Sequence, residues 1–171
     1  MKTKILIFLC AVLCFSSCQI EENPKPDVPE SLTFDIDENG VDDFQIRYID
    51  DAIIYSPTTS EAILCYFEIL GNNEILNKTE APFLFLKDVT EIKKDVADPF
   101  YWQKINAQIA SLENHYKNGW GSTWKIASNG VQDHYLIGIK LNNIAESKIG
   151  WIKITIDNNT GQAKIVDSEV Q

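Results

Sequence analysis

Histidine and cysteine are scarce in this chain, and their scarcity excludes several kinds of site. Only two histidines occur, His115 and His134, and neither has a second histidine or a cysteine at a spacing that would hold zinc. No nucleophile elbow, phosphate-binding loop or dinucleotide-binding motif is present. The sequence therefore offers no recognisable catalytic constellation, and we interpret both histidines as structural and solvent-exposed.

If the apolar N-terminal segment is removed from the mature chain, the four cysteines leave no pair for a disulfide. Cys10 and Cys14 belong to the apolar N-terminal run, and Cys18 follows directly after it. Cys65 then remains alone. It lies in the strand-like stretch AILCYF, with no basic residue near it in sequence to activate a thiol, so we expect a buried small hydrophobe.

Basic residues are few relative to acidic ones. The whole chain has 15 lysines and arginines against 25 aspartates and glutamates. If the N-terminal segment that carries Lys2 and Lys4 is removed, 13 basic residues remain against the same 25 acidic ones, a formal charge of −12. Phosphate backbones and anionic head groups repel such a protein, so we expect no nucleic-acid partner.

The N-terminus predicts export. A basic start, with Lys2 and Lys4, precedes an apolar run at residues 5–15 that is too short for a membrane span of ~20 residues. The sequence FSSC at residues 15–18 resembles the lipobox of bacterial lipoproteins, with Phe15 at the position where leucine is commoner. This resemblance implies cleavage before Cys18 and acylation of that cysteine, which would anchor the protein to a membrane. The alternative is an ordinary signal peptide.

Composition divides the rest of the chain into a tether and one domain. Residues 18–31 contain three prolines and several acidic residues, and they have too few apolar side chains to bury themselves. We predict an extended, mobile tether here, carrying lipid on Cys18. Residues 32–171 are sufficient for one domain with one core, after a signal peptide at residues 1–17.

Apolar residues in the domain recur mostly with the period of strands. Residues 44–48 (FQIRY) and 151–156 (WIKITI) alternate apolar and polar side chains. Strands are also expected at residues 32–34, 52–55, 63–70, 74–77, 83–86, 122–126, 135–141 and 163–166, with 74–77 as the hairpin partner of 63–70, and the strand that contains 151–156 is expected to begin at residue 149. Residues 158–161 (NNTG) predict a hairpin turn before the last strand. These patterns predict a mainly β domain, an antiparallel sandwich or a barrel-like fold.

One segment has helical spacing instead. Apolar side chains at Trp102, Ile105, Ile109, Leu112 and Tyr116 are separated by three or four residues. An aspartate and a proline precede them as expected for a helix start, and Asn–Gly at residues 118–119 suits a helix end. We therefore predict one helix inserted between the strands.

An acidic loop at residues 35–43 (DIDENGVDD) is the strongest candidate for a metal site. Short oxygen-bearing side chains at alternate positions of a tight loop can converge on a hard cation such as calcium. The candidate ligands are Asp35, Asp37, Asn39, the backbone carbonyl of Val41, and Asp43, whose role Asp42 could take over. Gly40 would let the chain turn with a positive φ. The alternative is a turn without an ion, because Asp, Asn and Gly are turn residues in any case.

The acidic loop is similar to known calcium loops. It resembles the start of an EF-hand, but its twelfth position is Ile46 instead of glutamate and strands flank it in place of helices. It is closer to the short calcium loops between strands of FG-GAP and thrombospondin type 3 repeats. This resemblance implies calcium as the ion.

A wider resemblance concerns the whole exported domain. The segment at residues 35–44, the strand YLIGI at 135–139 and the strand GWIKI at 150–154 are similar to signatures of small exported lipoproteins of Bacteroidota-type bacteria. Ile149 stands where those proteins usually have an aromatic residue. The sequence CQIEE at residues 18–22 also resembles the acidic signal that sends such lipoproteins to the outer face of the outer membrane. The periplasmic face is the alternative, and this family implies no activity.

Two classes of function remain open. The first is a non-enzymatic binding or interaction module with a calcium-stabilised loop and a glycan or protein ligand. The second is a small glycan-acting hydrolase that uses acidic residues, for which two facing carboxylates in a pocket would be required. Trp120 and Trp124 are candidates for stacking on a ligand, although core packing is the alternative for both rings.

Overall fold

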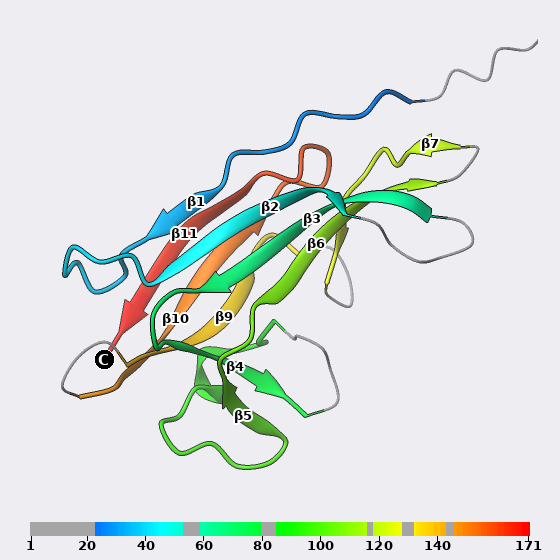
Figure 1. Ribbon diagram of the computed structural model, residues 1–171. Coiled ribbons are helices and arrows are strands. Elements are labelled where there is room, and N and C mark those ends of the chain that lie inside the picture. Colours follow the sequence, from blue (N-terminus) through cyan, green and yellow to red (C-terminus); the bar gives the residue numbers. More distant parts are fainter. Residues whose placement is uncertain (1–22, 53–58, 80–84, 116–117, 128–131, 143–145) are drawn as a thin grey trace, which may run out of the picture.

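The protein is seen here in a computed structural model that describes residues 23–52, 59–79, 85–115, 118–127, 132–142 and 146–171 (Figure 1). The predicted signal peptide, Cys18 and the first residues of the predicted tether lie outside these described residues. So do residues 53–55 of the strand expected at 52–55, residues 83–84 of the strand expected at 83–86, and Tyr116 of the expected helix. In the part of the chain that the structure describes, no helix is long and apolar enough to cross a membrane.

The described chain is mainly β, and its strands form two antiparallel sheets. The strands are β1 (Leu32–Phe34), β2 (Phe44–Ala52), β3 (Thr59–Ile69), β4 (Glu74–Lys78), β5 (Phe100–Gln103), β6 (Ala107–His115), β7 (Gly119–Trp120), β8 (Lys125–Ile126), β9 (Tyr135–Leu141), β10 (Lys148–Ile156) and β11 (Ala163–Val170). One sheet has the order β1-β2-β3-β6-β7, with β8 also paired to β6, and the other has the order β11-β10-β9-β4-β5. Of the two expected architectures, the described strands adopt the sandwich-like one, with two separate sheets.

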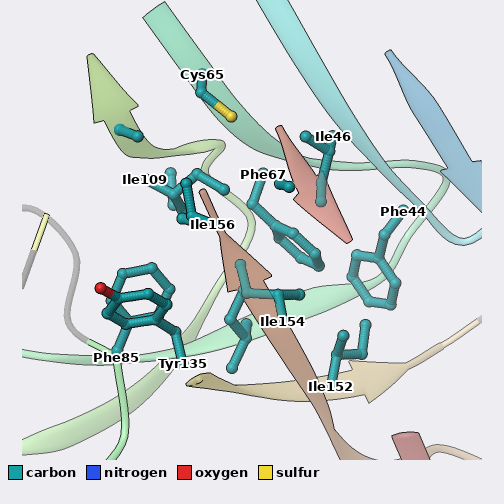
Figure 2. Packing of buried hydrophobic residues seen from close by; sticks show 14 of the residues in the cluster. Phe44, Ile46, Cys65, Phe67, Phe85, Ile109, Tyr135, Ile152, Ile154 and Ile156 are labelled. Carbon is teal, nitrogen blue, oxygen red and sulfur yellow. The ribbon is translucent and has the colours of Figure 1, made fainter. Parts of the chain in front are cut away.

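The two sheets share one hydrophobic core. Strands alternate inward and outward side chains, so every second residue of β10 is buried, including Ile152 and Ile154. Figure 2 shows these isoleucines opposite Phe44 and Phe67 of the other sheet, whose rings stack at 5.2 Å. Full burial of each such side chain stabilises the fold by about 1.5–3 kcal/mol. This core fixes which face of each strand points inward.

Several strand predictions are confirmed. Residues 32–34 and 135–141 form β1 and β9 within the predicted bounds. The alternating segments that begin at Phe44 and Trp151 lie in β2 and β10, and residues 157–162 connect β10 to its hairpin partner β11. β10 shows the period of two that is typical of a strand with one buried face, whereas nearly every residue of β9 is buried.

The predicted helix is wrong. Its residues form β5 and β6, and the only helical element among the described residues is the short 3-10 turn η1 (Val89–Glu91). The apparent helical spacing has two causes. Ile105 lies between the two strands and is 60% exposed. A bulge in β6, opposite Cys65 and Tyr66, shifts the strand's phase so that Ile109 and Leu112 are both buried although they are three residues apart.

The predicted pairing of residues 74–77 with 63–70 is also wrong. β3 and β4 lie in different sheets, and β4 pairs with β5 and β9. Residues 70–73, with Gly71 at φ 61°, therefore carry the chain from one sheet to the other. Asn73 is fully buried at this crossing.

The outer face of the second sheet has its own small core. Leu76, Leu86 and Leu136 are buried there, and the partly buried rings of Trp102 and Trp151 flank them. Gly138 on this face meets the side chains of Leu76 and Leu86, which leave no room for a Cβ atom. Residues 85–99, which precede β5, thus cover part of the outer face of this sheet.

Residues 23–31, which we call the strap, are extended as expected but contact the domain along their length. Asn23 forms a parallel bridge with Gly119. The Lys25 ammonium lies 2.8 Å from an Asp50 carboxylate oxygen, and Val28 packs against the main core. In Figure 1 the strap (blue) runs from β7 to the start of β1.

Candidate metal centre

The acidic loop (residues 35–43) connects β1 to β2 and turns through two residues with positive φ. Gly40 has a φ of 87°, which confirms the conformation expected from the sequence. Glu38 has a φ of 58°, a left-handed conformation that costs a residue with a Cβ atom about 1–2 kcal/mol. The loop therefore folds back tightly enough to bring its first and last residues together.

Backbone amides hold the Asp35 carboxylate in place. Asp35 Oδ1 accepts a hydrogen bond from Asn39 N at 3.1 Å, and Oδ2 accepts one from Gly40 N at 2.6 Å. Asn39 Oδ1 in turn accepts a hydrogen bond from Val41 N at 2.8 Å. These bonds close the loop on itself and orient Asp35 toward its centre.

Asp43 ties the loop to the core. Its side chain is fully buried, and Oδ2 accepts a hydrogen bond from Ile36 N at 2.9 Å. Oδ1 accepts a hydrogen bond from Asn73 Nδ2 at 3.0 Å. The Asp43 backbone bonds to Phe34 O and Leu70 N, so the residue links β1, the loop and the crossing between the sheets. A buried carboxylate with this many donors has a fixed position.

Asp37 completes a group of three carboxylates. Asp35, Asp37 and Asp43 each offer an oxygen, and these atoms lie within 4.8 Å of one another. Asp37 Oδ1 is buried and accepts no hydrogen bond from the described residues. Buried oxygens normally have a partner, and a cation would supply one here. This cluster could therefore hold a metal ion.

The structure brings three of the five predicted ligands together. The Asn39 side-chain oxygen bonds to the Val41 amide, and the Val41 side chain is 59% exposed. Ligation by Asn39 and by the Val41 carbonyl stays a prediction. Asp42, the predicted substitute for Asp43, is exposed, while Asp43 is the residue that reaches the cluster.

Sequence reasoning missed the asparagine network behind the loop. Asn73 Oδ1 accepts a hydrogen bond from Asn142 N at 2.9 Å, and Asn142 Oδ1 accepts one from Ser147 Oγ at 2.7 Å. The network thus connects Asp43 to the β9–β10 connection in the other sheet. The residues Gly71-Asn72-Asn73 predict a turn, but nothing in their spacing reveals that the third one is buried under the acidic loop.

Trp120 and Trp124 do not offer a stacking surface. Each is 5% exposed and belongs to the main core. The Trp124 ring packs directly over Gly161 and meets Tyr48 edge-on at 6.0 Å between ring centroids. Both rings are therefore part of the core, and the burial of Trp120 and Trp124 does not support the predicted stacking on a ligand.

The remaining cysteine and the two histidines lie outside the carboxylate cluster. Cys65 is fully buried, as predicted, and burial raises the pKa of its thiol to about 12. The His115 ring lies 3.9 Å from a Glu113 carboxylate oxygen and is about one-third exposed. His134 is exposed beside a cavity of about 220 Å³. None of these residues joins the carboxylate cluster.

The hydrolase alternative requires two facing carboxylates in one pocket, and several open cavities on the described surface contain acidic residues. The cavity of about 450 Å³ at the β10–β11 turn contains one acidic residue, Asp157. The cavity of about 360 Å³ beside β5 contains Glu91 and Asp95. Glu91 Oε2 accepts a hydrogen bond from Lys87 N at 2.9 Å, so this carboxylate serves the local turn.

Comparison of the chain with protein-family models, with curated proteins and with solved structures finds no match.

Proposed function

We propose that this chain is an exported, lipid-anchored, non-enzymatic binding module whose acidic loop binds calcium. The observation that carries the metal part is the Asp37 oxygen, which is buried among carboxylates without a hydrogen-bond partner from the described residues. The export and anchor parts rest on the lipobox-like sequence that ends at Cys18 and on the resemblance to small exported lipoproteins.

The ligand set favours a hard cation. Its members are carboxylates, whereas zinc and softer metals prefer histidine and cysteine. Three carboxylate oxygens within 4.8 Å repel one another by about 3.5 kcal/mol or more per ionised pair at an effective dielectric constant of ~20. A divalent cation converts this repulsion into attraction.

Calcium suits the loop better than magnesium does. Magnesium requires a near-ideal octahedron at short distances, while calcium accepts six to eight oxygens in variable geometry. Asp35 and Asp43 are already oriented by backbone amides and Asn73, so only the remaining lone pairs face an ion. Water would supply the rest. This partial coordination and the exposed neighbours suggest a dissociation constant of ~10⁻⁴–10⁻³ M, in the range of extracellular modules.

The proposed ligand of the module is a glycan or a protein, and the proposed location is the outer face of the outer membrane. The acidic residues after Cys18 support the outward orientation, with the periplasmic face as the alternative. The strong negative charge argues against nucleic acid as the partner.

Calorimetric titration with calcium tests the metal site directly. The unaltered protein should bind one calcium ion, and Asp37→Ala should abolish binding because it removes the unpartnered oxygen. Asp42→Ala is the matched control, since it removes the same charge from an exposed neighbour outside the cluster. Equal loss of binding in both variants would show a nonspecific charge effect instead of a site.

Fatty-acid labelling in cells tests the anchor. The unaltered chain should incorporate a labelled fatty acid, and Cys18→Ala should not, because it lacks the acylated sulfur. Label retained by Cys18→Ala would overturn the anchor while leaving the metal site untouched.

A further inference from the structure

The strap (residues 23–31) is held to the domain at four points. Asn23 Nδ2 donates a hydrogen bond to Trp120 O at 3.1 Å. The Lys25 ammonium binds Asp50 and lies 5.7 Å from the centroid of the Trp120 ring. Further along, Val28 packs on the main core, and Ser31 Oγ accepts a hydrogen bond from Tyr48 N at 3.3 Å. Contacts of polar, ionic and apolar kinds thus hold the whole strap.

These contacts shorten the free chain between the proposed anchor and the domain. A mobile tether of residues 18–31 would let the domain move well away from a membrane. With the strap docked, only five peptide steps separate Cys18 from Asn23. Fully extended, they span at most about 18 Å. The point where Asn23 meets β7 must therefore stay close to the lipid.

The strap also sets which end of the domain is near the lipid. Asn23 docks at β7, beside Gly119 and Trp120, whereas β1 leads into the acidic loop. Figure 1 shows these two places at opposite ends of the six-stranded sheet. Twelve extended steps from Asn23 to Asp35 correspond to a separation of up to about 40 Å.

We propose that the strap holds the β7 end of the domain against a lipid surface, so that the acidic loop faces away from the membrane. The inference rests on the proposed lipid anchor for its place in the cell. The docked strap itself rests on described contacts. The face that carries the acidic loop, with the neighbouring β3–β4 and β9–β10 connections, is then the one presented to a partner.

Energy transfer to a vesicle measures this orientation. Residues 18–171, with Cys18→Ser and a hexahistidine tag placed directly before them, are held on uncharged phosphatidylcholine vesicles that contain a nickel-chelating lipid and an acceptor-labelled lipid. A donor dye is attached to Ser122→Cys, near β7, or to Val41→Cys, in the acidic loop; both positions are exposed and Cys65 is buried. Transfer should be several-fold stronger from position 122 than from position 41.

Undocking the strap should reduce this difference. Lys25→Ala combined with Val28→Asp removes an ionic and an apolar contact, so transfer from the two positions should become similar. Asp27→Asn, an exposed change within the strap, should preserve the difference. Circular dichroism verifies that each variant is folded.

Equal transfer from both positions in the chain with an unaltered strap would overturn the proposal, whatever the strap variant does. Stronger transfer from position 41 would overturn it as well. Because the tag replaces the lipid, these outcomes do not depend on acylation of Cys18. Fatty-acid labelling decides that question separately, so failure of the anchor and failure of the orientation are distinguishable.

Discussion

The β1–β2 and β10–β11 connections are built from the same residue types, aspartate, asparagine and glycine, but they treat their carboxylates differently. In the β10–β11 turn, Asp157 Oδ1 accepts hydrogen bonds from Asn159 N at 2.8 Å and Thr160 N at 2.9 Å. These backbone hydrogen bonds lower the pKa of Asp157 below its usual 3.8. The single exposed carboxylate of this turn thus receives its hydrogen bonds from the turn's own backbone.

The acidic loop gathers three carboxylates where the other turn has one. Backbone amides donate hydrogen bonds to Asp35, and a backbone amide and the Asn73 side chain donate to Asp43. Asp37, in contrast, has a buried oxygen that accepts no hydrogen bond from the described residues. Asn158 Oδ1 in the β10–β11 turn is also buried without such a partner, but it is a lone, neutral amide oxygen. The comparison shows that turn composition alone does not distinguish the two loops; the surplus negative charge beyond the local hydrogen-bond donors does, and it is this surplus that could hold a metal ion.

The glycines of the two loops lie in different surroundings, and this difference predicts the largest effect of a substitution on the free energy of unfolding. Gly161 has a φ of 73° and lies under the Trp124 ring, which a Cβ atom would overlap. Gly40 has a φ of 87° with open space around it. Gly161→Ala should cost roughly 2–5 kcal/mol from overpacking and left-handed strain together. Gly40→Ala should cost about 1–2 kcal/mol from strain alone.

Urea denaturation of both variants measures the two free energies of unfolding. The unaltered protein in the same buffer is the reference. Equal losses in the two variants would contradict the packing of Trp124 on Gly161.

Within the acidic loop, replacing Asp43 should lower stability when calcium is absent, whereas replacing Asp37 should not. Asp43→Ala deprives the buried Asn73 amide and Ile36 N of their acceptor, which should cost about 2–4 kcal/mol. Asp37→Ala removes an oxygen without a hydrogen-bond partner from the described residues and relieves repulsion, so stability in chelator should stay the same or rise. Denaturation in chelator compares them, and a larger loss for Asp37→Ala would show that its carboxylate has a structural partner.

The smallest expected effect concerns the pH dependence of the β10–β11 turn. Because the folded-state pKa of Asp157 is lowered, its contribution to stability is present above the unfolded pKa and is lost as pH falls through the folded value. Asp157→Ala should therefore lower the melting temperature at neutral pH, and the loss should shrink below the ordinary value of 3.8. Thermal melts across this range measure it. A loss that is constant with pH would mean that the charged form of Asp157 is not the stabilising one.

Sequence reasoning recovered strands whose local sequence pattern is uninterrupted, and it failed where a bulge or a connection interrupts the pattern. β9 and the alternating parts of β2 and β10 follow their own local pattern. The bulge in β6 depends on its pairing with β3, more than forty residues earlier, and no local pattern encodes that pairing. The exposed Ile105 then completes a spacing that resembles a helix.

The carboxylate cluster could be predicted from the sequence for a related reason. Its three carboxylates lie within one nine-residue loop, so spacing along the chain was sufficient to bring Asp35, Asp37 and Asp43 together. Asn73 and Asn142 belong to distant connections and meet the loop only because the two sheets pack. The strap escaped prediction similarly, because its proline-rich composition conceals the contacts that Lys25 and Val28 make with distant strands.

A thermal melt of residues 19–171 in chelator, in calcium and in magnesium tests most directly whether the surplus carboxylate marks a cation site. At ten times its dissociation constant, calcium should stabilise the folded state by about 1.4 kcal/mol. This corresponds to a rise of roughly 3–6 °C in melting temperature for a domain of this size. Magnesium should raise it less, Asp37→Ala should abolish the calcium shift, and Asp42→Ala should retain it. If calcium moves the midpoint no more than sodium chloride of equal ionic strength does, the acidic loop is a turn without an ion.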